Sequence, residues 1–245
     1  MKNKKIRYLL ISVLSITLII LLGVGVWLSQ TYKPTNQLLA LVSEDQYDKI
    51  DDFYVFNPKI ESNHVGIVLY PGALVEPLSY GYYANELSKQ GYLVAIADVS
   101  LNLSIMDNEK ADEFIEQHKD VTSWYIGGHS MGGVSATMYA SNHLDQIDGV
   151  ILLGSYPSSS TDLSQTDLNV LSLYAEFDGL STEEEVFSQV NNLPSDTSYV
   201  EISGGNHAQF GMYGEQSGDL EATISVLEQQ NEMVNETLEF LNHTK

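Results

Sequence analysis

The sequence contains no cysteine, and this absence excludes several kinds of chemistry. Without a thiol the chain forms no disulfide, has no thiolate nucleophile and builds no cysteine-type zinc site. It also lacks the lipid-modified cysteine that anchors a bacterial lipoprotein. Any membrane attachment must therefore come from another part of the chain.

Positive charge is scarce and gathers at the N-terminus. The chain has 11 lysines and arginines against 33 acidic residues. Its basic cluster ends at Arg7, and no acidic residue appears before Glu44. The negative charge of the acidic body repels nucleic acid. This body also has no arginine, so it lacks the guanidinium fork that recognises carboxylates and phosphates. We expect no nucleic-acid partner and a neutral substrate, although an acidic exterior can also serve solubility alone.

Short motifs for metals and nucleotides are missing as well. The chain has no H-E-x-x-H motif, no close pair of histidines and no G-x-x-x-x-G-K-[ST] motif. These patterns hold catalytic zinc or nucleotide phosphates in the proteins that carry them. The sequence therefore implies no cofactor and no metal.

One long apolar run is present near the N-terminus. Residues 8–28 contain no charged side chain, and as a helix they would span about 30 Å, the thickness of a hydrocarbon core. The basic residues before it predict a cytoplasmic N-terminus and an extracytoplasmic body. A cleaved signal peptide is the alternative, but its apolar core is normally shorter and is followed by a small-x-small site. We expect an uncleaved single-pass signal anchor in the cell membrane.

The rest of the chain has the composition of a folded domain. With 43% hydrophobic and 18% charged residues, it is not a disordered chain. We divide the sequence into a cytoplasmic basic tail (1–7), a transmembrane signal anchor (8–28), a tether (29–51) and one catalytic-size domain (52–245). A domain of about 200 residues is long enough for a full-sized core.

Apolar runs alternate with helical patterns along this domain. Strands are predicted at 53–56, 65–70, 92–97, 124–129, 149–154, 168–175 and 197–202, and helices at 77–90, 107–118, 134–140, 183–190 and from 219 onward. This alternation predicts an α/β fold with a mostly parallel sheet and helices on both faces. Catalytic groups in such sheets gather beyond the carboxyl ends of the strands.

A strand that runs into a glycine turn supplies the candidate nucleophile. Residues 124–133 read Trp-Tyr-Ile-Gly-Gly-His-Ser-Met-Gly-Gly, so Gly128, Ser130 and Gly132 form the pattern G-x-S-x-G. A sharp strand-to-helix turn exposes the serine Oγ, and glycines on either side avoid a Cβ collision. Taken alone the pattern is weak, so its context decides.

Two more side chains follow later strands in the order of a Ser-Asp-His triad. Asp178 comes three residues after one predicted strand, and His207 lies in the loop after the next. His207 would take the Ser130 proton as general base, and Asp178 would hold its tautomer. Asp98 is an alternative acid after an earlier strand. His129, beside the nucleophile, is interpreted as a packing and hydrogen-bonding residue.

The remaining site residues are predicted from their positions around this serine. The N–H of Met131, at the start of the following helix, and the N–H of Ala73, after a Pro-Gly pair, would form the oxyanion hole. Tyr156, Phe210 and Tyr213 are candidate substrate-binding residues, with packing as their alternative role. Only about thirteen residues separate the strands at 149–154 and 168–175, so we expect no large lid and an open site.

These motifs resemble the α/β-hydrolase superfamily, and specifically the small bacterial hydrolases of the dienelactone-hydrolase-like group, α/β-hydrolase family 5. The similar stretches are 69–77 with Tyr80, 101–103, 127–133, 147–153, 174–180 and 204–214. The resemblance covers roughly residues 50–243 and implies a serine hydrolase, often with an N-terminal membrane segment. Dienelactone hydrolases proper use a cysteine nucleophile, so their lactone specificity is not implied. Pro71 stands where a histidine before the oxyanion glycine is usual.

Together these features predict a serine hydrolase that cleaves a carboxylic ester or thioester through an acyl-enzyme. Its partners would be a small-molecule ester and the membrane that holds the N-terminal helix. An acyltransferase or thioesterase with the same triad is one alternative, because acyl-enzyme chemistry is shared and only the acceptor differs. A non-catalytic binding module on the same fold is another. Acyl length and oligomeric state are left open.

Overall fold

The computed structural model describes residues 2–244, which fall into two compact units. The first unit comprises Met1–Thr31 and the second Tyr32–Lys245. The predicted basic tail and the predicted domain each include one terminal residue, Met1 and Lys245, that lies outside the described residues.

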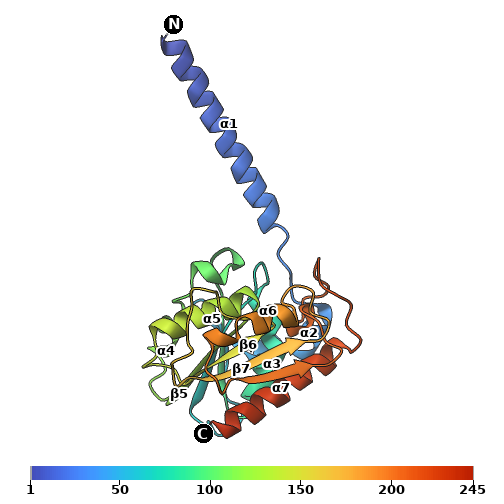
Figure 1. Cartoon of the computed structure of the whole chain (residues 1–245). Coiled ribbons are helices and arrows are strands. Elements are labelled where there is room, and N and C mark those ends of the chain that lie inside the picture. The colour runs from blue at the N-terminus through green and yellow to red at the C-terminus, as the bar shows by residue number, and fades with distance from the viewer. Residues whose placement is uncertain (1, 245) are drawn as a thin grey trace. The chain divides into compact units, whose positions relative to one another are not determined.

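The first unit is a single long helix, α1 (Lys2–Leu28), drawn in dark blue in Figure 1. Its stretch Lys4–Trp27 is long and apolar enough to cross a membrane, judged by length and composition. Apolar side chains are exposed all along it, with Leu14 at 71%. A helix that is apolar on every side is typical of a buried or membrane-spanning segment. The expected long apolar N-terminal helix is confirmed, whereas its orientation stays a prediction.

The second unit is built on an eight-stranded sheet in the order β1-β2-β4-β3-β5-β6-β7-β8. The strands are β1 (Asp48–Ile50), β2 (Phe53–Phe56), β3 (Val65–Tyr70), β4 (Leu93–Ala97), β5 (Ser123–His129), β6 (Gly149–Leu153), β7 (Asn169–Ala175) and β8 (Ser198–Ile202). Strands β3 to β8 are parallel to one another, and β1 and β2 add an antiparallel edge next to β4. The predicted mostly parallel sheet is confirmed.

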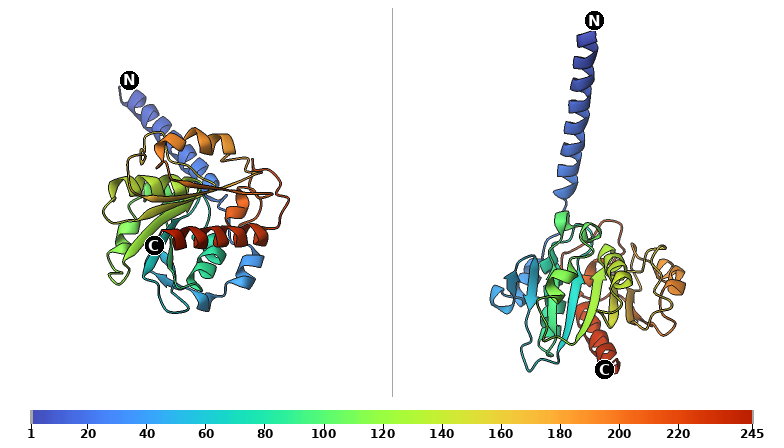
Figure 2. Two further views of the ribbon diagram at one scale, coloured as in Figure 1. Left: turned by 60° about the horizontal axis from the view of Figure 1, so that its bottom comes forward. Right: turned by 90° about the vertical axis from the view of Figure 1, so that its left-hand side faces the viewer.

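Helices cover both faces of the sheet. The α-helices are α2 (Asn36–Leu41), α3 (Gly81–Ser88), α4 (Ala111–Ile115), α5 (Met131–Asn142), α6 (Glu183–Ser188) and α7 (Val226–His243). The 3-10 turns are η1 (Glu44–Gln46), η2 (Pro77–Tyr80), η3 (Ser100–Asn102), η4 (Ser104–Met106), η5 (Val190–Asn192) and η6 (Ala208–Phe210). Figure 2 shows α3 and α7 on one side of the sheet and α5 on the other.

The two faces contribute to two hydrophobic clusters. Successive side chains of β3 point to opposite faces. Ile67 accordingly joins the core under α2, α3 and α7, and Val68 joins the core under α4 and α5. Because both faces are covered, all six residues of β3 are buried. This explains why its sequence is a continuous apolar run rather than an alternating one.

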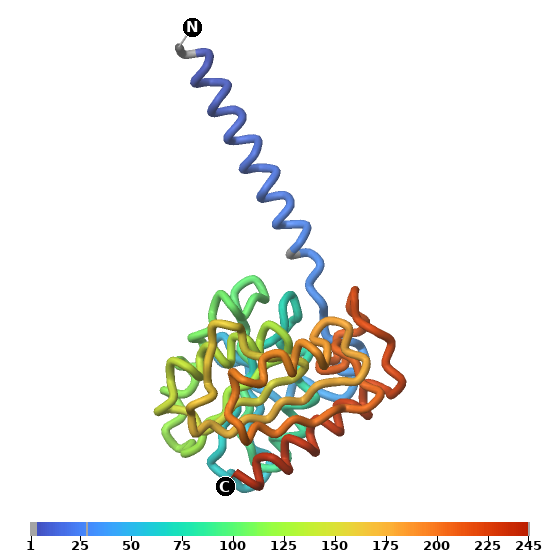
Figure 3. The backbone as a smooth tube through the Cα atoms, viewed as in Figure 1, coloured from blue at the N-terminus to red at the C-terminus, as the bar shows by residue number. Residues whose placement is uncertain are grey.

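Some elements differ in length from the sequence-based expectation. Helix α4 covers only 111–115, whereas a helix was expected over 107–118. Residues 36–50, which were expected in the tether, form α2, η1 and β1. Leu38 is fully buried in this segment, and Thr35 N–H donates to Met212 O at 2.9 Å, so the chain here packs on the domain. Figure 3 traces this path.

The carboxyl ends of the parallel strands meet at one edge of the sheet, where the predicted site residues follow β3, β5, β6, β7 and β8. Residues 154–168 connect β6 to β7 without any helix, in agreement with the expectation that no large lid is inserted there. The last helix begins at Val226 after a capping box between Ser225 and Glu228. Residues 219–225, which were expected to be helical, are therefore available to contact the loops.

Candidate active site

Ser130 sits at the turn between β5 and α5 in a conformation that few residues adopt. Its φ is 54° and its ψ is −121°, and its N–H donates to Leu153 O at 3.1 Å. A Cβ at Gly128 would lie 2.3 Å from the carbonyl carbon of Gly132. A Cβ at Gly132 would lie 2.1 Å from Tyr70 O. Only glycines fit on both sides of the serine, which is the geometry expected of a nucleophile elbow.

Asp178 and His207 contact each other directly in the interior. His207 Nδ1 lies 2.8 Å from Asp178 Oδ2, and the two side chains are 1% and 0% exposed. The other carboxylate oxygen, Oδ1, accepts the N–H groups of Leu180 at 2.8 Å and Ser181 at 2.6 Å. Three donors therefore hold the carboxylate, and charge-assisted bonds of this kind are strong. With Nδ1 donating to Asp178, the lone pair of the neutral imidazole lies on Nε2.

Nε2 of His207 is buried and has no hydrogen-bond partner among the described residues. It is the atom that was predicted to accept the Ser130 proton. The structure thus brings Asp178 and His207 together, while no hydrogen bond links His207 to Ser130 in the part of the chain it describes. Such a catalytic bond is often long in a ligand-free site and tightens only when substrate binds. The roles of the three residues stay predictions.

Asp219 joins the loop that carries Asp178 to the loop that carries His207. Its Oδ1 accepts the N–H of Gly179 at 3.0 Å and of His207 at 3.3 Å, and its Oδ2 accepts the N–H of Ala208 at 2.8 Å. Sequence reasoning missed this residue, because its position in an expected helix gave no sign of a contact with two loops.

Gln229 of α7 holds the other side of the histidine loop. It is fully buried, its Oε1 accepts the N–H of Asn206, and its Nε2 donates to Asn206 O, both at 2.9 Å. The backbone N–H and the backbone carbonyl of Asn206, the residue before His207, are thus both held by Gln229. The signal that could have indicated this role is a polar residue on the apolar face of the last helix.

Tyr80 links the turn after β3 to the histidine beside the nucleophile. Its hydroxyl accepts the N–H of Gly72 at 2.9 Å and lies 2.9 Å from His129 Nδ1. Since the hydroxyl has one proton and accepts at Gly72, we assign the donation to His129 Nδ1, which places the His129 proton on Nε2. Burial raises the pKa of Tyr80 well above its usual range, so the phenol stays neutral.

His129 is itself held in the neutral form. Burial lowers its pKa well below the usual value of about 6.5, and the neighbouring His207 lowers the pKa further. The two imidazole centroids are 4.4 Å apart. His129 therefore packs against the predicted general base without adding a positive charge beside it.

The predicted oxyanion donors lie next to these groups along the chain. Met131 is the first residue of α5, where a helix leaves its N–H groups free. Ala73 follows Gly72, whose N–H is bound by Tyr80. In the part of the chain that the structure describes, neither N–H donates to a protein acceptor. Both are available as donors, and their role stays a prediction.

The three candidate substrate-binding aromatics differ in exposure. Phe210 is fully buried; a Cβ at Gly154 would lie 2.8 Å from its ring. Tyr213 is nearly buried, and its hydroxyl donates to Gln216 Oε1 at 2.8 Å. Tyr156 is half-buried. Packing explains Phe210 as the structure stands, and substrate contact stays a prediction for all three.

Comparison with known proteins identifies the class. Residues 66–231 match the Alpha/beta hydrolase family, and the chain belongs to that family. The resemblance inferred from the motifs is therefore confirmed. The comparison with curated proteins finds no match.

Several solved structures share the fold. Dienelactone hydrolase from Anabaena variabilis is 14% identical with a TM-score of 0.60, covering 78% of this chain and 90% of its own. Est1E from Butyrivibrio proteoclasticus, with ferulic acid bound, is 14% identical with a TM-score of 0.59, covering 80% and 99%. Monoglyceride lipase from Saccharomyces cerevisiae, in complex with a substrate analogue, is 12% identical with a TM-score of 0.61, covering 82% and 94%. At these identities the likeness concerns the fold.

Proposed function

We propose that this chain is a serine hydrolase that cleaves a carboxylic ester or thioester through an acyl-enzyme formed on Ser130. One observation carries the proposal: a buried His207–Asp178 pair, 2.8 Å apart, leaves His207 Nε2 without a partner among the described residues, at the sheet edge where the elbow serine lies. Because His207 Nδ1 donates to Asp178, the lone pair of the neutral imidazole lies on Nε2, which can accept the Ser130 proton.

In this proposal Ser130 Oγ attacks the ester carbonyl while its proton passes to His207 Nε2. Asp178 stabilises the imidazolium, and the oxyanion receives the N–H groups of Met131 and Ala73. The imidazolium then gives the proton to the departing alcohol or thiol. A water molecule repeats the sequence on the acyl-enzyme and releases the acid, which restores the hydroxyl of Ser130.

The substrate class follows from the surroundings of the site. Est1E and the monoglyceride lipase share this fold and are crystallised with ferulic acid and a substrate analogue, which supports a carboxylic ester here. The loop from 154 to 168 contains no helix that could close over the site. A chain of 33 acidic residues with its only arginine at Arg7 favours a neutral ester.

We further propose that α1 anchors the enzyme in the cell membrane and that the catalytic domain works outside the cytoplasm. The support is the exposed apolar stretch Lys4–Trp27 and the basic residues at its start. Basic residues flank the cytoplasmic end of a spanning helix.

Labelling by a fluorophosphonate tests the nucleophile. We expect the purified chain to be labelled and Ser130→Ala to lose both labelling and ester hydrolysis. Ser141→Ala is the matched control, because this serine lies near the end of α5, the helix that follows Ser130, and its hydroxyl donates to Met138 O. Labelling that persists in Ser130→Ala would refute the assignment.

A panel of p-nitrophenyl esters of increasing acyl length tests the reaction. His207→Ala should lower the rate by roughly 10⁴-fold or more, because the general base is lost while the oxyanion donors remain. Added alcohols that appear in the products would indicate an acyltransferase. A wild-type chain that neither takes the probe nor cleaves any ester would be a binding module.

A further inference from the structure

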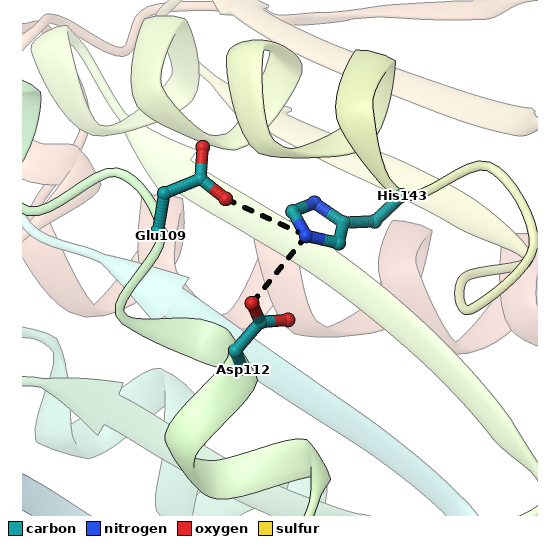
Figure 4. Close-up of side chains that lie close together, drawn as sticks. All are labelled: Glu109, Asp112 and His143. Carbon is teal, nitrogen blue, oxygen red and sulfur yellow. Dashed lines mark ion pairs between the residues drawn. The ribbon is translucent and has the colours of Figure 1, made fainter.

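Three side chains point toward one another at the end of α5 that lies opposite Ser130. They are Glu109, Asp112 of α4 and His143, and Figure 4 shows both carboxylates directed at the same imidazole nitrogen. His143 Nε2 lies 3.5 Å from Glu109 Oε2 and 3.4 Å from Asp112 Oδ2. One ligand atom from each residue lies within 4.8 Å of the others.

One neighbour, Tyr139, holds the atoms of His143 and Asp112 that face away from the cluster. His143 Nδ1 lies 3.0 Å from Tyr139 O, and the two rings stack with centroids 4.1 Å apart. The Tyr139 hydroxyl donates to Asp112 Oδ1 at 2.7 Å. Because Nδ1 donates to a carbonyl, the lone pair of the neutral imidazole lies on Nε2 and faces the carboxylates.

Glu109 is oriented in the same way by two amides. Its Oε1 accepts from Asn108 Nδ2 at 3.0 Å and from Asn142 Nδ2 at 3.2 Å, which leaves Oε2 turned to His143. All three residues thus use one atom for an outer hydrogen bond and direct a second atom inward. Protein metal sites orient their histidine and carboxylate ligands by outer bonds of this kind.

Among residues 4–244, no lysine or arginine forms an ion pair with Glu109 or Asp112. Lys110 is the nearest lysine along the chain, and its ammonium pairs with Asp52 at 2.7 Å and Glu113 at 3.0 Å instead. The C-terminal end of α5 adds its own partial negative charge at this point. The cluster therefore presents a lone pair and two carboxylate oxygens where a cation is electrostatically favoured.

We propose that Glu109, Asp112 and His143 bind a divalent transition metal ion, with Zn²⁺ as the best fit. Tetrahedral zinc with bonds of about 2.0–2.2 Å sets neighbouring ligand atoms roughly 3.4 Å apart, close to the two imidazole–carboxylate separations. A protonated imidazole that donated to a carboxylate would lie nearer, at about 2.7–2.9 Å. An imidazole ligand also favours zinc over calcium or magnesium, which prefer oxygen ligands. The metal would tie α4 to the end of α5.

Calorimetric titration of the full chain with ZnCl₂ tests the site. The chain is purified in detergent micelles with a histidine-free tag and stripped of metal by EDTA. We expect one Zn²⁺ per chain, and a Tm raised by about 5–10 °C when free Zn²⁺ is a hundredfold above Kd. His143→Ala should weaken binding by more than about 100-fold, since a direct ligand is lost.

Two further variants keep the test decisive. Glu109→Gln changes an exposed side chain, so it tests the ligand set even where His143→Ala does not fold, and it should weaken binding similarly. His243→Ala is the control: its Nδ1 also bonds a carbonyl four residues earlier, Glu239 O at 2.8 Å, at a helix end. The proposal fails where the wild-type chain binds no Zn²⁺, where Ca²⁺ binds more tightly, or where Glu109→Gln binds like the wild type.

Discussion

Tyr80 illustrates how single residues hold this site in place. Its hydroxyl sits between Gly72 and His129, so it connects the turn after β3 with the residue that precedes Ser130. No protein atom other than this hydroxyl accepts the Gly72 N–H in the described residues. The position of the neighbouring Ala73 N–H, a predicted oxyanion donor, therefore depends on a side chain outside the triad.

Tyr80→Phe should lower both stability and ester hydrolysis. The change leaves the Gly72 N–H and His129 Nδ1 without partners, and each such buried group costs about 1–3 kcal/mol. Tyr82→Phe is the matched control, because its hydroxyl donates to Asn231 Oδ1 at 2.8 Å in an exposed place. Denaturant unfolding and the rate of ester cleavage measure the two effects. Equal effects of the two substitutions would contradict this role for Tyr80.

His129 predicts a pH dependence of stability. Its pKa is lowered in the folded chain, mainly by burial, whereas the unfolded chain protonates near 6.5. Below about pH 6.5 the unfolded state therefore binds more protons than the folded state. The free energy of unfolding decreases as the pH is lowered, by up to about 1.4 kcal/mol per pH unit. His129→Gln should flatten this slope in denaturant titrations between about pH 5 and 7. A wild-type slope in His129→Gln would exclude this origin.

The sequence predicts the triad candidates but not the residues around them. Ser130 lies in a local pattern, and Asp178 and His207 each follow a recognisable apolar strand. Asp219 and Gln229 act through hydrogen bonds to backbone groups of loops more than ten residues away. Such contacts depend on how loops fold, which no local pattern records.

The crossing of β3, β5 and α5 is the element-scale feature that fixes the nucleophile. Gly132, in the first turn of α5, lies so close to the end of β3 that an added Cβ would meet Tyr70 O at 2.1 Å. The backbone of Gly132 belongs to α5 and the carbonyl of Tyr70 belongs to β3, so neither can move without shifting its whole helix or strand. Close packing of α5 against β3 therefore fixes the position of Ser130 at the start of the helix.

Gly132→Ala should destabilise the domain by about 3 kcal/mol and abolish hydrolysis, because α5 must move away from β3. Gly23→Ala in α1 is the control, since an added Cβ there meets nothing within 4 Å. Thermal unfolding and fluorophosphonate labelling report the two effects. A Gly132→Ala chain with wild-type labelling would show that the crossing tolerates a side chain.

Long, fully buried elements were predicted better than short ones. Strands β3 and β4 are apolar runs because both faces of the sheet are covered, and each was predicted from its run. Helices α2 and α4 have only 6 and 5 residues. Isolated helices this short are marginal, so tertiary contacts such as that of the buried Leu38 determine them. Periodicity within the sequence cannot report such contacts.

At the scale of the whole chain, charge and hydrophobicity are strongly segregated. All 33 acidic residues follow position 43, while Lys4, Lys5 and Arg7 precede the apolar part of α1. The apolar side chains of α1 are exposed along its length, at 50–71% for residues such as Ile11 and Leu14. Exposed apolar side chains along a helix of this length fit a hydrocarbon environment, which supports the proposed membrane anchor.

This segregation predicts the behaviour of the chain in a bacterial host. The full chain should remain in the membrane fraction through a high-salt wash, because apolar burial rather than charge holds it there. A chain that begins at Tyr32, where the second compact unit starts, should be released into the soluble fraction. Because basic residues flank the cytoplasmic end of a spanning helix, we expect protease added outside intact spheroplasts to digest the domain. A domain protected until lysis would reverse the orientation, and release of a form without α1 would indicate a cleaved signal peptide.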